Sequence, residues 1–198
     1  MRVIVLAKAP VAGKVKTRLM PQYNAEQAAA LHKQMTEAVI TKVCSMFDDV
    51  WLAVDNIKHP FFTDLKQRFG FELHHQNHGD LGMRMRHLTA YSFATDDEPI
   101  MFLGTDSPHV NISRYQQVKR ALTDHDIVLG PVDDGGYDLI AMHTYFPEVF
   151  DNITWGTDSV FSETIININN LDLIVKVLDT SFDLDHAEDL QRAPPHTW

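Results

Sequence analysis

The sequence predicts an α/β protein, with a sheet that has a parallel half and helices on both faces. Short apolar runs of strand length alternate with segments whose apolar residues recur at helical spacing, in the order β-α-β-α-β over residues 3–75. Such alternation is typical of crossover connections between parallel strands. The chain has 198 residues, 44% of them hydrophobic. We therefore expect one core and a single domain over residues 1–198.

The first half of the chain shows clear signals for where its elements begin and end. Three apolar runs predict strands at residues 3–7, 50–54 and 71–75. The first helix is expected to open at Pro21 and Asn24, with Gln27 completing a capping box. The second helix is expected at residues 60–69 and ends at Gly70, because glycine readily adopts the left-handed conformation that follows a helix.

The second half continues with strands and helices in alternation. Further strands are expected at residues 100–103, 126–132, 137–142 and 173–178. Helices are expected from residue 83 to 91 through Met83, His87, Leu88 and Tyr91, from 111 to 123, and from 159 onward. Asn111 is the expected N-cap of the second of these, and Thr157 or Asp158 of the third. A Gly-Gly pair between residues 132 and 137 indicates a hairpin.

The charge, the length of the opening apolar run and the cysteine content of the chain each exclude a class of partner or of covalent link. With 17 Lys and Arg against 27 Asp and Glu, the formal charge is −10, which opposes the phosphate backbone of nucleic acids, so no nucleic-acid partner is expected. The opening apolar run is too short for a signal peptide or a membrane span, so no membrane partner is expected. The one cysteine, Cys44, allows no intrachain disulfide, and we expect a cytoplasmic protein.

A basic loop directly follows the first predicted strand. Residues 8–18 hold Lys8, Lys14, Lys16 and Arg18, a local reversal of sign that suits a diphosphate or triphosphate. A solvated surface loop is the alternative interpretation. The loop is not a Walker A motif, because a valine follows its Gly-Lys pair, and the chain contains no G-x-G-x-x-G pattern for a nicotinamide site.

Acidic residues follow several of the predicted strands. Asp106 follows the buried strand at residues 100–103, where ligands collect in open α/β sheets, although it could simply cap the turn. Asp183 and Asp185 alternate with a leucine, so both project to one side of an extended segment. Such oxygen ligands favour Mg²⁺ or Mn²⁺. Asp134, in the hairpin turn, could orient or deprotonate an acceptor hydroxyl.

Two further turns hold residues that could contact a ligand. Gly79 and Gly82 would let a ring or a ribose approach the backbone, although glycines in turns are more often only turn chemistry. Trp155 could stack on an acceptor or fill the core, and the core is the favoured interpretation.

Six motifs, in this order, resemble those of a known bacterial family. They are Val5–Leu19, Gly79–Gly82, Gly104–Pro108, Gly130–Tyr137, Trp155–Asp158 and Asp183–Leu190. Together they resemble a family of unknown function within the GT-A, or nucleotide-diphospho-sugar transferase, superfamily, some of whose members are described as glycosyltransferases of arsenosugar biosynthesis. The resemblance spans nearly the whole chain. It implies a three-layer α/β/α sandwich with a mostly parallel mixed sheet and one antiparallel strand.

The resemblance also implies roles for individual residues. Asp106 takes the place of the superfamily's D-x-D metal acid, but here Thr105 and Ser107 flank a single carboxylate, so Asp183 or Asp185 is expected to help hold the metal. The nucleotide-binding residues expected are Ala7, Lys8, Gly13, Lys14, Lys16, Thr17, Arg18, Gly79 and Gly82. The acceptor-side residues expected are Gly135, Gly136, Tyr137 and Trp155, with Asp106 and Asp134 as the catalytic acids.

The function implied is metal-dependent transfer of a sugar from a nucleotide diphosphate sugar to a small-molecule acceptor. The basic loop is also similar to that of phospholactate guanylyltransferase and, more distantly, of molybdenum-cofactor nucleotidyltransferases. Nucleotidyl transfer from a nucleoside triphosphate is therefore the alternative, and a nucleotide-binding protein without turnover is a third hypothesis.

Overall fold

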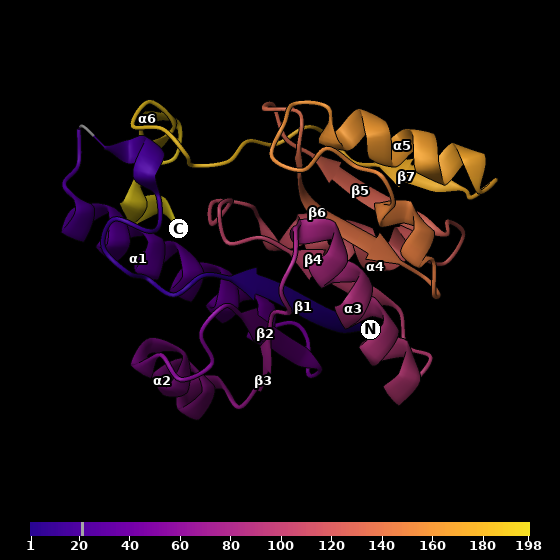
Figure 1. The fold of residues 1–198 in the computed structure, drawn as a ribbon, viewed down its shortest axis with the longest axis horizontal. Helices are drawn as coiled ribbons and strands as arrows, with labels where there is room; N and C mark the ends of the chain where they lie inside the picture. The colour runs from indigo at the N-terminus through magenta and orange to yellow at the C-terminus, as the bar shows by residue number, and fades with distance from the viewer. Residues whose placement is uncertain (21) are drawn as a thin grey trace.

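The fold is built on one seven-stranded sheet with the order β3-β2-β1-β4-β6-β5-β7 (Figure 1). The computed structural model describes residues 1–20 and 22–198. The strands are β1 (Arg2–Ala7), β2 (Val50–Val54), β3 (Glu72–His75), β4 (Ile100–Leu103), β5 (Ile127–Pro131), β6 (Tyr137–Met142) and β7 (Val175–Val177). Strands β1, β2, β4 and β5 are buried throughout or nearly so, which is why they appear in the sequence as continuous apolar runs.

The predicted α/β class with a mostly parallel mixed sheet is confirmed. Strand β6 runs antiparallel to both of its neighbours, β4 and β5, and every other strand pair in the sheet is parallel. The hairpin between β5 and β6 is the one expected from the Gly-Gly pair. Because β6 is antiparallel to both β4 and β5, those two strands are parallel to each other. Their carboxyl ends therefore lie at the same edge of the sheet as those of β1 and β2.

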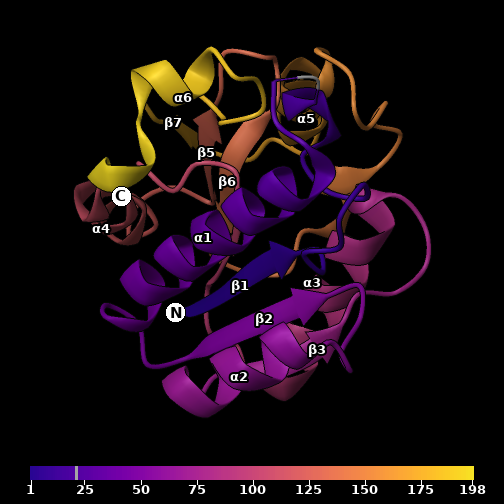
Figure 2. The same ribbon diagram turned by 90° about the vertical axis from the view of Figure 1, so that its left-hand side faces the viewer.

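Helices cover both faces of the sheet, as the views in Figures 1 and 2 show. They are α1 (Ala25–Cys44), α2 (Pro60–Phe69), α3 (Leu81–Thr95), α4 (Ile112–Ala121), α5 (Val160–Asn170) and α6 (Asp189–Arg192). Residues of α1, α2 and α4 pack in one core cluster with Val3 and Val5 of β1. Residues of α3 and α5 pack with Ile4 of the same strand in a second cluster. Alternate side chains of β1 therefore face the two helical layers, as a strand period of two requires.

Two helix ends follow the sequence signals. Asn24 and Gln27 form the expected capping box at the start of α1. Helix α2 ends at Gly70, whose φ of 77° is the left-handed conformation. Pro21, the other residue expected to open α1, lies outside the described residues.

Other boundaries differ from the prediction. Helix α5 has Ser159 as its N-cap residue, with no side-chain capping bond, so neither Thr157 nor Asp158 is the cap. The Thr157 hydroxyl instead donates to the carbonyl of Thr154 within the preceding turn. The strand expected at residues 173–178 has only three residues, β7, because the amide of Leu173 closes the end of α5 by donating to Ile168.

Helix α3 buries only part of the face expected from the sequence. Leu88 is buried as expected, together with Met85, but Met83 is 58% exposed and Tyr91 is 52% exposed. Of the described helices, none is both long and apolar enough to cross a membrane.

Candidate active site

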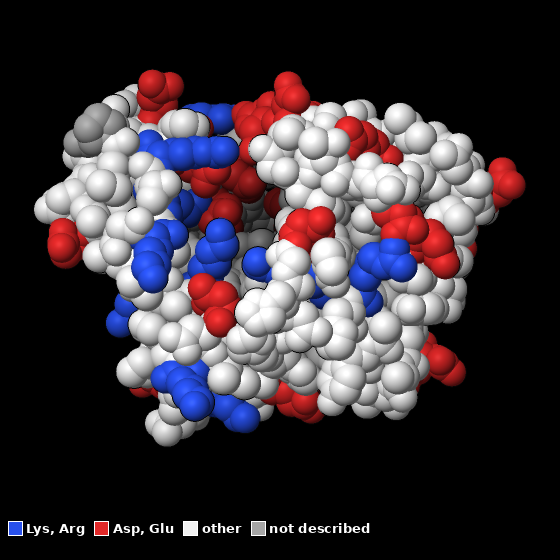
Figure 3. Space-filling model, viewed as in Figure 1, with Lys and Arg blue, Asp and Glu red and all other residues white. Residues whose placement is uncertain are grey.

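A cavity of about 450 Å³ opens at the edge of the sheet where β1 and β4 end (Figure 3). It is lined by the loop after β1, the loop after β4, the start of α3 and β6, and residues 183–185, which we call the acidic strap. Ten of the residues expected from the sequence line it: Ala7, Lys8, Lys14, Lys16, Thr17, Arg18, Asp106, Tyr137, Asp183 and Asp185. Chain segments nearly eighty positions apart, at Asp106 and the acidic strap, therefore meet at one place.

The remaining candidates are not among the described residues that line the cavity. They are Gly13, Gly79, Gly82, Asp134, Gly135, Gly136 and Trp155. The Asp134 carboxylate accepts a hydrogen bond from the Gly136 amide at 2.9 Å, as an acid in a turn often does. A Cβ on Gly82 would lie 2.4 Å from Nε1 of Trp155, so this glycine lets the indole pack against the start of α3. Trp155 is half-buried against the core.

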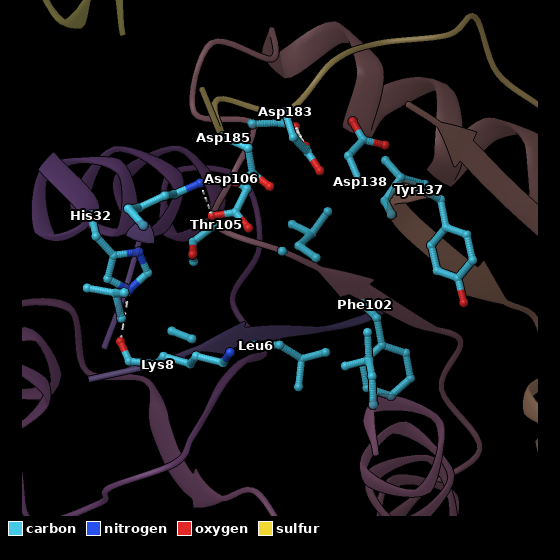
Figure 4. Close-up of a pocket in the computed structure, with 18 of the residues that line it drawn as sticks. Leu6, Lys8, His32, Phe102, Thr105, Asp106, Tyr137, Asp138, Asp183 and Asp185 are labelled. Atoms are coloured by element: carbon cyan, nitrogen blue, oxygen red, sulfur yellow. Dashed lines mark hydrogen bonds and ion pairs between the residues drawn. The ribbon is translucent and has the colours of Figure 1, made fainter. Parts of the chain in front are cut away.

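Lys16 and two carboxylates, those of Asp106 and Asp185, form the centre of the polar side of the cavity; Figure 4 shows the two acids lying close together. Lys16 Nζ lies 2.7 Å from Asp106 Oδ1 and 2.8 Å from Asp185 Oδ1, and the lysine side chain is only 4% exposed. Burial alone would lower the pKa of Lys16, but the charges of Asp106 and Asp185 outweigh it and raise that pKa. Burial would likewise raise the pKa of Asp106, and the Lys16 ammonium holds it below the usual value. Both groups therefore stay ionised at neutral pH.

Asp183 has a different environment from its neighbour in the strap. Its carboxylate accepts a short hydrogen bond from the Ser107 hydroxyl, which also donates to the carbonyl of Phe182 at 3.1 Å. Burial and the nearby charge of Asp106 raise the pKa of Asp183 to about 7, although the Ser107 hydrogen bond acts in the opposite direction. The strap thus adds more negative charge to this corner than Lys16 alone compensates.

The carboxylates fit a divalent cation that is also bound by a ligand. No three His, Cys, Asp or Glu side chains in the described chain are grouped so that they alone could hold a metal. Mg²⁺ commonly takes only one or two protein carboxylates and shares the rest of its shell between phosphate oxygens and water. Asp106, Asp183 and Asp185 line one cavity, so two of their carboxylates and a bound phosphate could together supply such a shell.

The other side of the cavity carries free cations and apolar surface. Lys8 and Lys14 line it, and no carboxylate of the described residues lies within ion-pair distance of either ammonium. Figure 4 shows Lys8 on the side opposite Asp183 and Asp185, with Leu6 and Phe102 continuing that wall and Tyr137 beside Asp138. Burial raises the pKa of Tyr137, so its phenol is protonated.

A family model described as "Uncharacterized protein conserved in bacteria (DUF2064)" matches residues 36–157, more than half of the chain. The chain belongs to the DUF2064 family. A search of the curated proteins finds no match.

Solved structures share the fold of this DUF2064 protein. The crystal structure of a proposed nucleotide-diphospho-sugar transferase from Desulfovibrio desulfuricans G20 matches with a TM-score of 0.87 and 24% identity over 99% of this chain and 93% of that one. The inositol-1-phosphate CTP transferase of T. maritima matches with a TM-score of 0.61 and 12% identity over 100% and 94% of the two chains. CMP:2-keto-3-deoxy-manno-octonic acid synthetase in complex with CTP matches with a TM-score of 0.56 and 11% identity over 96% and 95%. At these identities the matches show the fold.

Sequence reasoning missed several residues of the site in this DUF2064 protein. His32 of α1 lies against the cavity, with Nε2 2.9 Å from the carbonyl oxygen of Lys8, and burial lowers its pKa. A polar residue one turn after Ala28, on the apolar face of a long helix, was the signal that could have revealed it. Gln76 and Arg84 also line the cavity; Gln76 Nε2 donates to the Ala53 carbonyl and its Oε1 accepts from Arg84 Nη1 at 3.1 Å.

The acidic strap is anchored by apolar contacts and by an aromatic stack. Leu184, fully buried, packs with Leu19 at the end of the basic loop and with residues of α1. Phe182, just before the strap, packs against the same cluster, and its ring stacks on His109 with 4.0 Å between ring centroids. Arg192 lies over the same Phe182 ring. The position of the strap therefore does not depend on its charges alone.

His109 predicts a pH dependence of stability. Burial lowers its pKa to about 4, helped by the charges of Lys42, Arg192 and Arg114, and neither ring nitrogen has a hydrogen-bond partner among the described residues. Between pH 6.5 and 4 the unfolded chain binds a proton that the folded chain does not, so this residue makes the free energy of unfolding fall as the pH falls through that range. We expect His109→Phe, which keeps the stack, to reduce this loss by about 1–2 kcal/mol, allowing for partial exposure. Urea denaturation from pH 4 to 7 measures it, and identical pH profiles for the two proteins would contradict it.

Proposed function

We propose that this protein is a divalent-cation-dependent transferase that moves a sugar from a nucleotide diphosphate sugar to a small-molecule acceptor. The observation that carries the proposal is the meeting of two oppositely charged groups in one cavity, the free lysines Lys8 and Lys14 on one wall and the carboxylates of Asp106, Asp183 and Asp185 on the other. Its location outside the carboxyl ends of parallel strands supports this, because ligands bind there in open α/β sheets.

In the proposed reaction the side chains bind and orient more than they react. Lys8 and Lys14 bind the phosphates of the donor, and the carboxylates of Asp106, with Asp183 or Asp185, hold Mg²⁺ or Mn²⁺. When bound, the cation supplies charge neutralisation for the leaving nucleoside diphosphate. The lysines add preorganised positive charge in a site that is partly closed to water, where electrostatic stabilisation is strongest.

The acceptor is proposed to approach from the side of β6. Tyr137 lines the cavity there, while its hydroxyl is buried on the side of Thr164 of α5, so the contact it offers an acceptor is that of its backbone and ring. Asp134 remains the predicted base for the acceptor hydroxyl, in the same turn as Gly135 and Gly136, and the Trp155 ring lies edge-on to the Tyr137 ring. A shift of that turn toward the cavity is required for Asp134 to act.

Nucleotidyl transfer from a nucleoside triphosphate is the second candidate. The solved structures that share the fold include nucleotidyltransferases, one of them from Methanothermobacter thermautotrophicus with a TM-score of 0.61 and 13% identity over 100% of this chain and 97% of that one. The cavity offers Arg84 of α3 and Arg18 of the basic loop, which also contacts Asp185, in addition to the free lysines, enough positive charge for a third phosphate.

Product analysis separates the two candidates. The protein is incubated with Mn²⁺ and each of a panel of nucleoside triphosphates and nucleotide sugars, with sugar phosphates and simple alcohols as acceptors. Release of a nucleoside diphosphate that depends on the acceptor supports sugar transfer. Release of pyrophosphate supports nucleotidyl transfer instead. Tight binding with neither product would show a nucleotide-binding protein and overturn both.

A further inference from the structure

The ammonium group of Lys16 has used all of its hydrogen-bonding capacity within the protein. A lysine ammonium has three N–H donors and no acceptor. Lys16 Nζ lies 2.7 Å from Asp106 Oδ1, 2.8 Å from Asp185 Oδ1 and 2.8 Å from the carbonyl oxygen of Leu184. One oxygen is therefore available for each donor, and none remains for a phosphate.

The same contacts occupy the carboxylates proposed to hold the metal. A divalent cation on Asp106 and Asp185 would replace Lys16 as their partner or lie beside it, and two like charges at that distance repel strongly when one of them, the Lys16 ammonium, is buried. Lys16 therefore cannot bind phosphate, and Asp106 and Asp185 cannot both bind the metal, until this ion-pair arrangement opens.

We propose that Lys16 blocks the binding of free divalent cations to Asp106 and Asp185, which we call the acid pair. When cation and nucleotide arrive together, the Lys16 ammonium moves from these carboxylates to the phosphates, so that the site takes its nucleotide as the metal chelate. This inference rests on the proposed function, because it uses the same cation and phosphate sites. The exchange conserves charge pairing: Asp106 and Asp185 exchange an ammonium partner for the metal, and Lys16 exchanges two carboxylates for phosphate oxygens.

The backbone dihedral angles of Lys16 are ones that the ion pairs of its side chain could hold in place. Its φ of 49° and ψ of 39° lie in the left-handed region, which a lysine rarely adopts because its Cβ crowds the following carbonyl. Three residues earlier, Gly13 has a φ of 77°. Breaking the ion pairs would free the loop to relax toward ordinary dihedral angles, which lowers the cost of moving Lys16.

The surroundings of Lys16 would stay in place during this exchange. Leu19, just after the loop, and Leu184 of the strap are both fully buried in one apolar cluster. Arg18 Nη1 also contacts Asp185 Oδ2 at 2.9 Å and can keep that carboxylate in position. The movement is thus confined to Lys16 and its neighbouring peptides, while the carboxylates remain where the cation would need them.

Two other lysines of the loop provide the first contact for an incoming nucleotide. Lys8 and Lys14 line the same cavity and have no carboxylate partner among the described residues. They can bind the phosphates of a chelate before Lys16 moves. Lys14 is also the natural control, since it is a lysine of the same loop that does not touch the acid pair.

Binding of Mn²⁺ alone, followed by its electron paramagnetic resonance signal and by calorimetry, tests the proposal. We expect wild-type protein to bind free Mn²⁺ weakly, and Lys16→Met to bind it about tenfold or more tightly, the usual scale of coupling between sites. Lys14→Met should bind free Mn²⁺ as the wild type does. A Lys16→Met affinity equal to that of the wild type would overturn the proposal, as would tight binding of free Mn²⁺ by the wild type.

A second measurement needs no variant and so holds even if Lys16→Met fails to fold. Wild-type protein is titrated with Mn²⁺ with and without inorganic pyrophosphate, after correction for Mn²⁺ binding to pyrophosphate in solution. A gain of about tenfold or more in Mn²⁺ affinity with pyrophosphate supports the exchange, and an unchanged affinity overturns it. The two proposals can fail separately. Weak binding of free Mn²⁺ that tightens with pyrophosphate, but without any transfer product, would refute the proposed function alone. Product formation together with tight binding of free Mn²⁺ would refute only the role of Lys16.

Discussion

Replacing Asp106 with alanine is expected to abolish Mn²⁺-dependent nucleotide binding while leaving the fold intact. The change removes a proposed metal ligand directly, so the loss should exceed the roughly 10–100-fold reduction in metal affinity that is typical when an outer-shell partner is removed. The fold should survive because Lys16 keeps Asp185 and the Leu184 carbonyl as partners. The Asp106 side chain is itself 43% exposed, and its removal leaves no buried charge unpaired, so stability should change little. Calorimetry with each nucleotide, with and without Mn²⁺, measures the effect.

A matched acid at the other end of the same strand provides the control. Asp97 precedes β4, is exposed, and lies at the edge of the sheet away from the cavity. Asp97→Ala should therefore bind the nucleotide and Mn²⁺ as the wild type does. If Asp106→Ala retained wild-type affinity in the presence of Mn²⁺, Asp106 would have to be removed from the proposed metal site.

Replacing Arg114 with leucine should destabilise the protein by about 3–5 kcal/mol, because it leaves a buried carboxylate without its partner. Arg114 Nη2 donates to Asp138 Oδ1 at 3.0 Å, and their side chains are only 12% and 5% exposed. Burial raises the pKa of Asp138, and Arg114 is the charge that counteracts it. The guanidinium also donates to the carbonyl of Asp179 at 2.7 Å, so it links β6 and α4 to the segment before the acidic strap. Urea denaturation at pH 7 gives the free energy of unfolding.

Two further variants show whether the charge is the cause. Arg120→Leu, an exposed arginine of the same helix, should change stability by less than about 0.5 kcal/mol. The double variant Arg114→Leu with Asp138→Leu should recover much of the loss, since replacing a whole buried ion pair by apolar groups is often neutral. A double variant as unstable as Arg114→Leu alone would mean that packing, and not the unpaired carboxylate, accounts for the effect.

Much of the fold followed from local sequence signals because those signals and the tertiary structure agree. Strands buried on both faces, such as residues 50–54, read as continuous apolar runs, and the capping box at Asn24 marks a helix start whatever packs around it. Where tertiary contacts determine which face of a helix is buried, the local apolar pattern was an incomplete guide. Met83 and Tyr91 are apolar in composition but exposed, because α3 turns the face of Met85 and Leu88 to the sheet.

The candidate site was predictable in its location but not in its internal pairing. The place of Asp106 after a central strand and the alternation of Asp183 with Asp185 were enough to expect convergence, since parallel strands end at one edge. The sequence does not reveal which oxygens a lysine side chain of four methylenes will reach, so the contact of Lys16 with the acids could not be foreseen. His32 was hidden for a related reason, because its role depends on a loop carbonyl far away in the chain.

The position of β6 has a consequence for the motions of the site. In the sheet, β6 lies between β4 and β5, so the hydrogen bonds of β6 connect the part of the sheet that contains β4 to the part that contains β5. Local opening of proteins tends to occur in contiguous units, and amide hydrogens report it through their exchange rates. Asp106 follows β4 and Tyr137 is the first residue of β6, and both line the cavity, so any loosening of β6 would be transmitted to the proposed site.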